Sequence, residues 1–324
     1  MSQPVRSEQR PSVWVQLSEA ARWIFAYDAE KNWSQVRVGV IVGGVLATAA
    51  LLWAFWPTIV EVVASWETVP DYSHGYLIAP IALFFLWARR DKFPGWSQGP
   101  IWAGLALILF GIGLRVIGAR MFLGSVDAWA FIVCLAGAAW VVLGTRVFWW
   151  SLPSIVYLFF AVPLPYRAER GLSLSLQTIA TKFSTWTLQL LGQPAIAEGR
   201  TILLGEHHLE VEHACSGMRI FLSIFAVAFA YLVLVRRSWW EKGLICLAII
   251  PIALIANMTR IVITGLLYQW VSGEAAQKFS HDWAGYAMIP FAALLFALML
   301  WYLRRVYREV DVFDNRDLIL AQRD

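Results

Sequence analysis

The chain has 324 residues, of which 59% are hydrophobic and only 15% charged, and its mean hydropathy is +0.60. Its 19 tryptophans and its apolar runs near the roughly 20 residues needed to cross a bilayer exclude an ordinary soluble domain and indicate a polytopic membrane protein. The net charge of +4 comes from Lys and Arg beside the apolar runs, not from a separate basic patch, so we expect no nucleic-acid partner.

The first 37 residues are too polar for a signal peptide, so we expect them to form a cytoplasmic segment and the first span to direct insertion. Within this segment, residues 12–27 place apolar side chains on one helical side. They are Val13, Trp14, Leu17, Ala20, Ala21, Ile24 and Phe25. This pattern predicts an amphipathic helix that anchors on the inner membrane surface.

Eight apolar runs follow, and we predict an all-α polytopic protein with about eight transmembrane helices in one membrane domain, residues 38–303. The predicted spans are residues 38–56, 74–88, 100–118, 126–144, 148–164, 215–235, 244–270 and 283–303. Residues 304–324 form a basic tail that we expect in the cytoplasm.

The distribution of basic residues predicts the orientation. With both termini inside, the cytoplasmic segments hold 17 of the 26 Lys and Arg residues, as expected for positive loops that stay in the cytoplasm. The segment 57–73 holds none and carries Glu61, Glu67 and Asp71, which suits an outer loop. The same reasoning places residues 192–214 outside.

An insert of residues 165–214 separates the fifth and sixth spans. The prolines at 163 and 165 end the fifth span, because proline removes a hydrogen-bond donor and disfavours helix before itself. Residues 169–191 have helical apolar spacing among polar side chains, which predicts a helix on or in the outer leaflet. Residues 195–211 alternate, with a turn at 205–207, and predict a small β-hairpin outside the membrane.

Cys215 follows this hairpin where the sixth apolar run begins. Ser216 and Gly217 come next, so the thiol stands at a helix N-terminus, where amide groups and the helix dipole stabilise a thiolate. The other two cysteines, Cys134 and Cys246, lie within apolar spans, and we expect them to be inert packing residues. Cys215 is therefore the candidate nucleophile.

Two further residues are expected at the same membrane depth. Arg260 lies about 16 residues from the cytoplasmic end of its span, or roughly 24 Å into a core of about 30 Å. An intramembrane arginine marks a functional site by default, and Asn257, one turn earlier on the same face, can orient it. His281 stands at the outer start of the eighth span. Cys215 can then attack a carbonyl, His281 can transfer a proton and Arg260 can stabilise the oxyanion.

These residues give the chain a resemblance to the exosortase and archaeosortase family of membrane transpeptidase-like cysteine enzymes. The family pattern is Cys-Ser-Gly, then Asn-x-x-Arg, then His-x-x-x-Gly, and it corresponds here to residues 215–217, 257–260 and 281–285. The sequence Asp-Tyr-Ser-His-Gly-Tyr at 71–76 and the Pro-Leu-Pro turn at 163–165 also resemble family features. Asp71 and His74 are thus candidates for lining the site or binding substrate.

The resemblance implies cleavage of C-terminal sorting tags of the PEP-CTERM kind on secreted proteins, at the outer face of the cytoplasmic membrane, without a cofactor. Cys215 would form a thioester, which an amine or water would resolve, so transfer and hydrolysis both remain open. Membrane lipids and polysaccharide export proteins are the other partners implied. A cell-surface or polysaccharide acceptor is consistent with that setting.

Several alternatives remain beside this reading. His213 stands where the family leads us to expect an acidic residue, with Glu212 shifted by one, so His213 is a second candidate base. The run 206–213 is rich in His and Glu, yet strand alternation divides these side chains between two faces, which disfavours a metal site. A transporter, or a noncatalytic subunit of a polysaccharide export system, would fit the spans without using Cys215 as a nucleophile.

Overall fold

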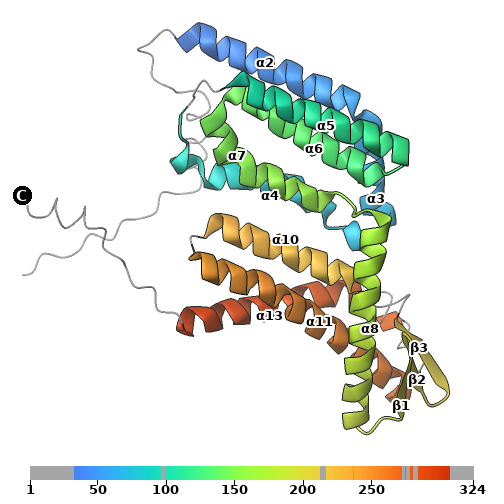
Figure 1. The fold of residues 1–324 in the computed structure, drawn as a ribbon. Helices are drawn as coiled ribbons and strands as arrows, with labels where there is room; N and C mark the ends of the chain where they lie inside the picture. The colour runs from blue at the N-terminus through green and yellow to red at the C-terminus, as the bar shows by residue number, and fades with distance from the viewer. Residues whose placement is uncertain are drawn as a thin grey trace, which may run out of the picture. The chain divides into compact units, whose positions relative to one another are not determined.

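The computed structural model describes residues 33–95, 100–211, 217–235, 237–271, 274, 278–279 and 284–306, with the side chains at 33–39 and 284–286 left out. The predicted amphipathic helix at 12–27 and most of the basic tail lie outside the described residues. The described part is mostly helical, as predicted, and it divides into two compact units (Figure 1). Unit 1 comprises residues 1–62 and 77–159, and unit 2 comprises residues 63–76 and 160–324.

Unit 1 is built from helices alone in its described part. They are α2 (Trp33–Ala54), most of α3 (Trp56–Thr68), most of α4 (Gly75–Ala88), the short η2 (Arg90–Lys92), α5 (Ile101–Met121), α6 (Gly124–Leu143) and α7 (Thr145–Tyr157). The helices α5 and α6 pair closely along their length, and α6 also packs on α2 and α7. This helix pair forms the centre of the unit.

Glycines spaced seven residues apart explain the tight α5–α6 pair. Gly104, Gly111 and Gly118 are all buried on the face of α5 that meets α6. A Cβ atom at Gly111 would lie 2.5 Å from Sγ of Cys134, and one at Gly104 would lie 2.9 Å from the carbonyl oxygen of Gly137. Small residues let helix backbones approach in this way, which is how helices associate where lipid removes the hydrophobic driving force.

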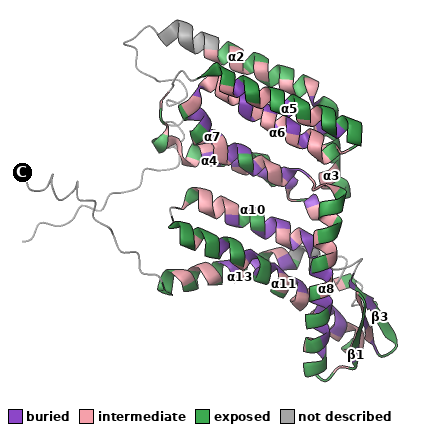
Figure 2. Cartoon of the chain, in the orientation of Figure 1, coloured by how far each residue is buried: buried purple, intermediate pink, exposed green. Residues whose placement is uncertain are grey.

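Unit 2 joins helices and one small sheet. It contains η1 (Pro70–Tyr72), α8 (Tyr166–Leu190), β1 (Ala195–Glu198), β2 (Thr201–Leu204), β3 (His207–Glu210), α10 (Met218–Leu234), α11 (Trp239–Trp270) and α13 (Ala284–Val306). The short η3 (Leu158–Ala161) belongs half to each unit. Buried side chains from α10, α11 and α13 make the main core, with Ile224, Ile249 and Phe296 at most 4% exposed. Figure 2 colours the buried, intermediate and exposed residues along these helices.

The strands form a three-stranded antiparallel sheet in the order β1-β2-β3. The sequence predicted a single hairpin with a turn at 205–207, and the structure adds a strand through a second two-residue turn at Gly199 and Arg200. Gly199 and Gly205 both have positive φ angles, 62° and 60°, which tight hairpin turns require. In the predicted hairpin region Ile202, Leu204, Leu209 and Val211 are buried, whereas Ile196 is 64% exposed.

The predicted number of eight spans is not confirmed. Four helices, α5, α6, α11 and α13, are long and apolar enough to cross a membrane, and two bent helix pairs raise the number to six at most among the described residues. The pairs are α2 with α3, bent by 69°, and residues 145–161 with α8, bent by 77°. The helix α10 is apolar but has 17 residues, and α4 has 14, so each falls short of the length required.

Two local predictions can be compared directly with the structure. The helix expected at residues 169–191 is confirmed as α8, and residues 162–165, which contain both prolines, separate it from η3 as expected. The outer loop predicted at residues 57–73 is wrong for most of its length, because Trp56 to Thr68 forms α3. Its three acidic residues suggested a loop, but charge alone does not prevent a helix.

Candidate functional site

The candidate site is centred on the N-terminus of α10. Gly217 is the N-terminal cap residue of this helix and has a φ angle of 71°, in the left-handed region. Its carbonyl oxygen accepts the first helical hydrogen bond, from the amide of Phe221 at 3.0 Å. Cys215, Ser216 and His213 precede it and lie outside the described residues. The structure therefore fixes the backbone two residues after the candidate nucleophile.

Gly217 lies against Asn257 of α11. A Cβ atom at Gly217 would be 3.0 Å from Nδ2 and 3.1 Å from Cγ of Asn257. Asn257 is itself only 1% exposed. The Cys-Ser-Gly and Asn-x-x-Arg segments, 40 residues apart in the chain, therefore meet where α10 begins.

Arg260 lies one turn after Asn257 on α11 and is partly buried. Its neighbour Ile261 is fully buried in a cluster with Ala180 and Leu188 of α8 and with Ile202 and Leu204 of β2. This cluster holds the second half of α11 against both α8 and the sheet.

The attachment of the sheet to α11 continues beyond this cluster. Nε2 of Gln269 donates a hydrogen bond of 2.9 Å to the carbonyl oxygen of Leu204. The ring of His207 lies 5.4 Å from that of Tyr268. A Cβ atom at Gly265 would lie 3.2 Å from both Leu188 and Leu204, so helix and sheet pack closely. Arg260 therefore lies on a part of α11 that packs against both α8 and the sheet.

The segment around η1 lies at the start of α10. The Asp71 carboxylate is 4.0 Å from Nε of Arg219, with about a quarter of each side chain exposed. Tyr72 is 2% exposed and packs with Met218 and Leu222 of α10. The hydroxyl oxygen of Tyr72 accepts a hydrogen bond of 3.0 Å from the amide of Leu164. Burial raises the pKa of Tyr72 well above its usual value, so this hydroxyl stays protonated.

His74 is a mostly buried imidazole of the same segment. Its Nε2 lies 3.2 Å from the carbonyl oxygen of Phe160, which can only accept, so this nitrogen carries a proton. Burial lowers the pKa of His74 below its usual value, and the positive charge of Arg219 acts in the same direction, so the ring is neutral near pH 7. This hydrogen bond attaches His74 to Phe160, which precedes the Pro-Leu-Pro turn at residues 163–165.

His281 lies outside the described residues, and α13 begins three residues after it. Of the predicted site residues, the structure brings Gly217 and Asn257 together, places Arg260 beside them on α11 and puts Asp71 against the start of α10. Sequence reasoning missed Tyr72 and Arg219. Tyr72 follows Asp71 directly, and Arg219 lies four residues after Cys215. This closeness in sequence to two predicted site residues is the signal that could have identified them.

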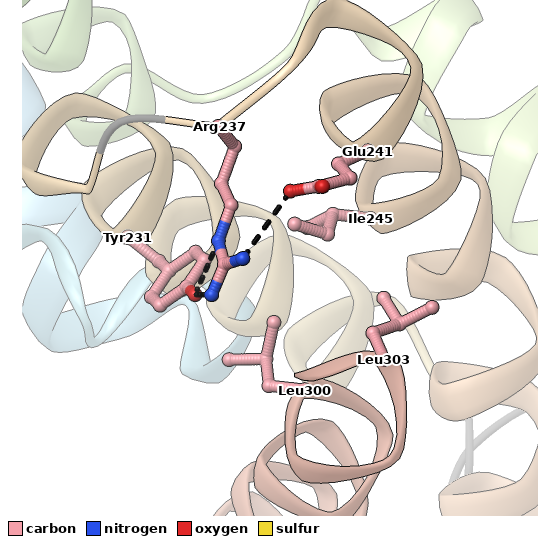
Figure 3. Close-up of a pocket in the computed structure, with 6 residues that line it drawn as sticks. All are labelled: Tyr231, Arg237, Glu241, Ile245, Leu300 and Leu303. Atoms are coloured by element: carbon pink, nitrogen blue, oxygen red, sulfur yellow. Dashed lines mark hydrogen bonds and ion pairs between the residues drawn. The ribbon is translucent and has the colours of Figure 1, made fainter. Parts of the chain in front are cut away.

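Two charged clusters lie elsewhere. The first cluster lies at the opposite end of α10, where the guanidinium of Arg237 donates hydrogen bonds to the Tyr231 hydroxyl and the Glu241 carboxylate (Figure 3). These residues line a small pocket together with Ile245. The Arg237 side chain is 9% exposed and pairs with Glu241 at 3.3 Å, which is a structural contact between the ends of two helices.

In unit 1, Arg115 lies within the apolar helix α5. Its Nε is 3.6 Å from the Asp127 carboxylate, and its guanidinium donates to the carbonyl oxygen of Ala54, where α2 breaks. The Thr58 hydroxyl also donates to Asp127. The sequence alone predicted no role for this arginine. Arg115 joins α5 to the end of α2, and Asp127 joins α6 to α3.

The other two cysteines differ from each other. Cys134 is buried between α5 and α6, as predicted for a packing residue. Cys246 is exposed on α11, so the prediction that it packs inside the protein is wrong. Helical position explains this, because the preceding residue, Ile245, takes the buried face. Within the described ranges, no three His, Cys, Asp or Glu side chains gather as metal ligands.

The fold and this site together define a helical membrane protein in which a Cys-Ser-Gly helix start meets an Asn-x-x-Arg helix. A family model described as transmembrane exosortase (Exosortase_EpsH) matches residues 66–300. This chain therefore belongs to the transmembrane exosortase family. No curated protein and no solved structure matches it significantly. The matched region contains η1, the whole α8-to-α11 region and most of α13.

Proposed function

We propose that this exosortase-family protein is a membrane cysteine peptidase or transpeptidase, with Cys215 as nucleophile, Arg260 as oxyanion stabiliser and His281 as proton carrier. The observation that carries the proposal is the contact between Gly217 and Asn257. It brings the segment that bears the thiol to the helix that bears the arginine. Family membership adds the expectation of sortase-like chemistry.

The reaction has two halves. The Cys215 thiolate attacks the carbonyl carbon of the scissile peptide bond, and the guanidinium of Arg260 stabilises the negative oxygen that develops. The C–N bond then breaks, His281 gives a proton to the leaving amine, and a thioester remains on Cys215. An incoming amine or water attacks the thioester and loses a proton to His281, and the C–S bond breaks to release the Cys215 thiolate.

Asn257 acts beside these groups as a supporting residue. Its side chain is buried and contacts Gly217, and it lies one turn from Arg260. Replacing it should disturb the thiol segment and the guanidinium together. His213 remains the alternative proton carrier, because it precedes Cys215 by two residues.

The proposed substrates are secreted proteins with a C-terminal sorting tag of the PEP-CTERM kind, cleaved at the outer face of the cytoplasmic membrane. An acceptor amine on a cell-surface or polysaccharide molecule would make the reaction a transfer, and water would make it a hydrolysis. Polysaccharide export proteins are the proposed neighbours. This orientation follows from the basic residues, which gather in the segments taken as cytoplasmic.

The test is to coexpress this chain with a tagged secreted protein and to follow the shorter product by immunoblot. Wild type should process the tag, whereas Cys215→Ala, Arg260→Ala and His281→Ala should each lose processing while accumulating in the membrane at wild-type level. Cys246→Ala, which removes an exposed thiol from α11, should process normally and serves as the matched control. Normal processing by Cys215→Ala would show that the proposal is wrong.

A further inference from the structure

We propose that Asp71, Tyr72 and Arg219 are positioning residues that hold the start of α10 and so set the place of the Cys215 thiol. The inference rests on the proposed function for its catalytic consequence. Its structural part, that these three residues fix the helix start, can be measured separately. None of the three is assigned contact with the reacting atoms.

Arg219 is in the first turn of α10, where a positive charge is unfavourable because the helix dipole is positive at that end. The nearby Asp71 carboxylate, at 4.0 Å, offsets this charge. Asp71 is therefore a compensating neighbour for this arginine. The pair joins α10 to η1, and it can form only when the helix start lies beside Asp71.

Tyr72 supplies a second, apolar contact to the same turn of α10. Met218 is fully buried and packs with Tyr72 and Trp66. The Tyr72 hydroxyl in turn receives the amide hydrogen of Leu164, in the Pro-Leu-Pro turn. Leu172 of α8 packs against the same cluster. Tyr72 thus connects α10, the turn and the first residues of α8.

The segment that carries Asp71 and Tyr72 is itself held firmly. Trp66 donates a hydrogen bond of 2.7 Å from Nε1 to the carbonyl oxygen of Ala161. After η1 in the chain, Nε2 of His74 donates a hydrogen bond to the carbonyl oxygen of Phe160. The residues flanking η1 are therefore attached to the chain at 160–161. An element anchored at both ends can hold its neighbour in one position.

The start of α10 is consequently held from two directions. Asp71 and Tyr72 hold Met218 and Arg219, and Asn257 holds Gly217. All three positions lie within four residues of Cys215. Because a displacement of about 1 Å at a reacting group can cost on the order of 100-fold in rate, loss of the η1 contacts should reduce turnover.

The test is a charge exchange in purified full-length protein in detergent or nanodiscs. Asp71→Arg and Arg219→Asp should each lower kcat on a tagged peptide by about 100-fold, with KM changed less than about threefold. The double variant restores the opposite charges and should recover at least about tenfold of that loss. Tyr72→Phe, which keeps the ring and removes the acceptor for the Leu164 amide, should lower kcat without changing KM.

A second readout does not require catalysis. In a Cys246→Ser background, the rate at which iodoacetamide alkylates Cys215 should fall in each single variant and return in the double variant. The neutral variants Asp71→Asn and Arg219→Gln provide the same comparison if a reversed charge reduces expression. Exchange of Arg237 and Glu241, an ion pair at the far end of α10, is the matched control and should leave both rates unchanged.

The outcomes separate the two proposals. Single variants with wild-type kcat and wild-type alkylation rates overturn the positioning role, and so does a double variant no better than either single variant. If Cys215→Ala cleaves as fast as wild type, the proposed function fails. The alkylation rates still decide the positioning role in that case.

Discussion

Gly217 and Asn257 are in contact where α10 begins, and a side chain at residue 217 would crowd this contact. A Cβ atom at Gly217 would lie 3.0 Å from Nδ2 of Asn257, and the φ angle of 71° also favours glycine. The two residues belong to the two motifs that carry the proposed nucleophile and the proposed oxyanion stabiliser. The contact and the φ angle together favour glycine at the third position of Cys-Ser-Gly.

Gly217→Ala should reduce processing sharply and lower the free energy of unfolding by about 1–2 kcal/mol from the left-handed conformation alone. The contact with Asn257 should add to this loss. Tag processing and thermal unfolding in detergent provide the measurements. Gly192→Ala is the matched control, because Gly192 has a φ angle of 78° and nothing within 4 Å of its Cβ position.

The control isolates the effect of the contact. Gly192→Ala should show the same conformational cost and keep normal processing. If both variants lose processing equally, the Asn257 contact does not explain the requirement for glycine at 217.

Arg260→Lys should lower the rate of tag cleavage by about 100-fold or more, although the charge is kept. Lysine cannot reproduce the planar guanidinium with its fixed donors, and loss of one oxyanion donor costs on the order of 100- to 1000-fold. The measurement is kcat on a tagged peptide. Arg237→Lys, at the other end of the α10–α11 pair, should retain activity. An active Arg260→Lys enzyme would argue for a purely charge-based role.

His74 should make stability depend on pH. Because its pKa is lowered in the folded protein, the unfolded chain binds a proton near its usual pKa of 6.5 that the folded protein does not. This contribution to stability is fully present above about pH 7.5 and is lost progressively as the pH falls through 6.5. His74→Gln, which can still donate to the Phe160 carbonyl oxygen, should reduce the fall in melting temperature between pH 7.5 and 5.5. An unchanged pH profile would contradict the buried, neutral state of this ring.

Gly111→Ala should destabilise unit 1, because its Cβ atom would lie 2.5 Å from Sγ of Cys134 and 3.2 Å from the Ala130 carbonyl oxygen. Inserting atoms into such a packed contact costs about 1–3 kcal/mol. Gly113→Ala, two residues along the same helix with open space around it, should be neutral or stabilising by up to about 1 kcal/mol. Thermal unfolding of the two variants, measured side by side, tests whether the α5–α6 pair depends on glycine.

Local patterns were sufficient to predict several elements. The prolines at 163 and 165 ended a helix as expected, and the apolar alternation from 202 to 211 identified the strands whose residues Ile202, Leu204, Leu209 and Val211 are buried. The sequence predicted one hairpin in residues 195–211, whereas the structure has three strands because residues 199 and 200 form a second turn. Only Ala195 of β1 is buried, so this strand lacks the alternating burial of β2.

The number of spans illustrates a limit of apolar runs. Hydropathy identifies apolar segments, but helix breaks depend on contacts from elsewhere in the chain. The bend after Ala54 is stabilised by Arg115, 61 residues away, and the sequence near residue 55 gives no sign of it. An apolar run that predicts one straight span can therefore form a bent helix pair. Likewise, the acidic segment 57–73, which predicted a loop, forms α3 over most of its length.

The sequence by itself determined the membrane class, the family resemblance and the three motifs around Cys215, Arg260 and His281, because composition and spacing are local properties of the chain. Only the tertiary structure decided that Gly217 meets Asn257 and that Asp71 pairs with Arg219, 148 residues away. Such contacts depend on how helices cross and which faces they bury, and these relations are set by packing across the whole unit. The helix that begins three residues after the proposed nucleophile is thus contacted by residues that only folding brings close.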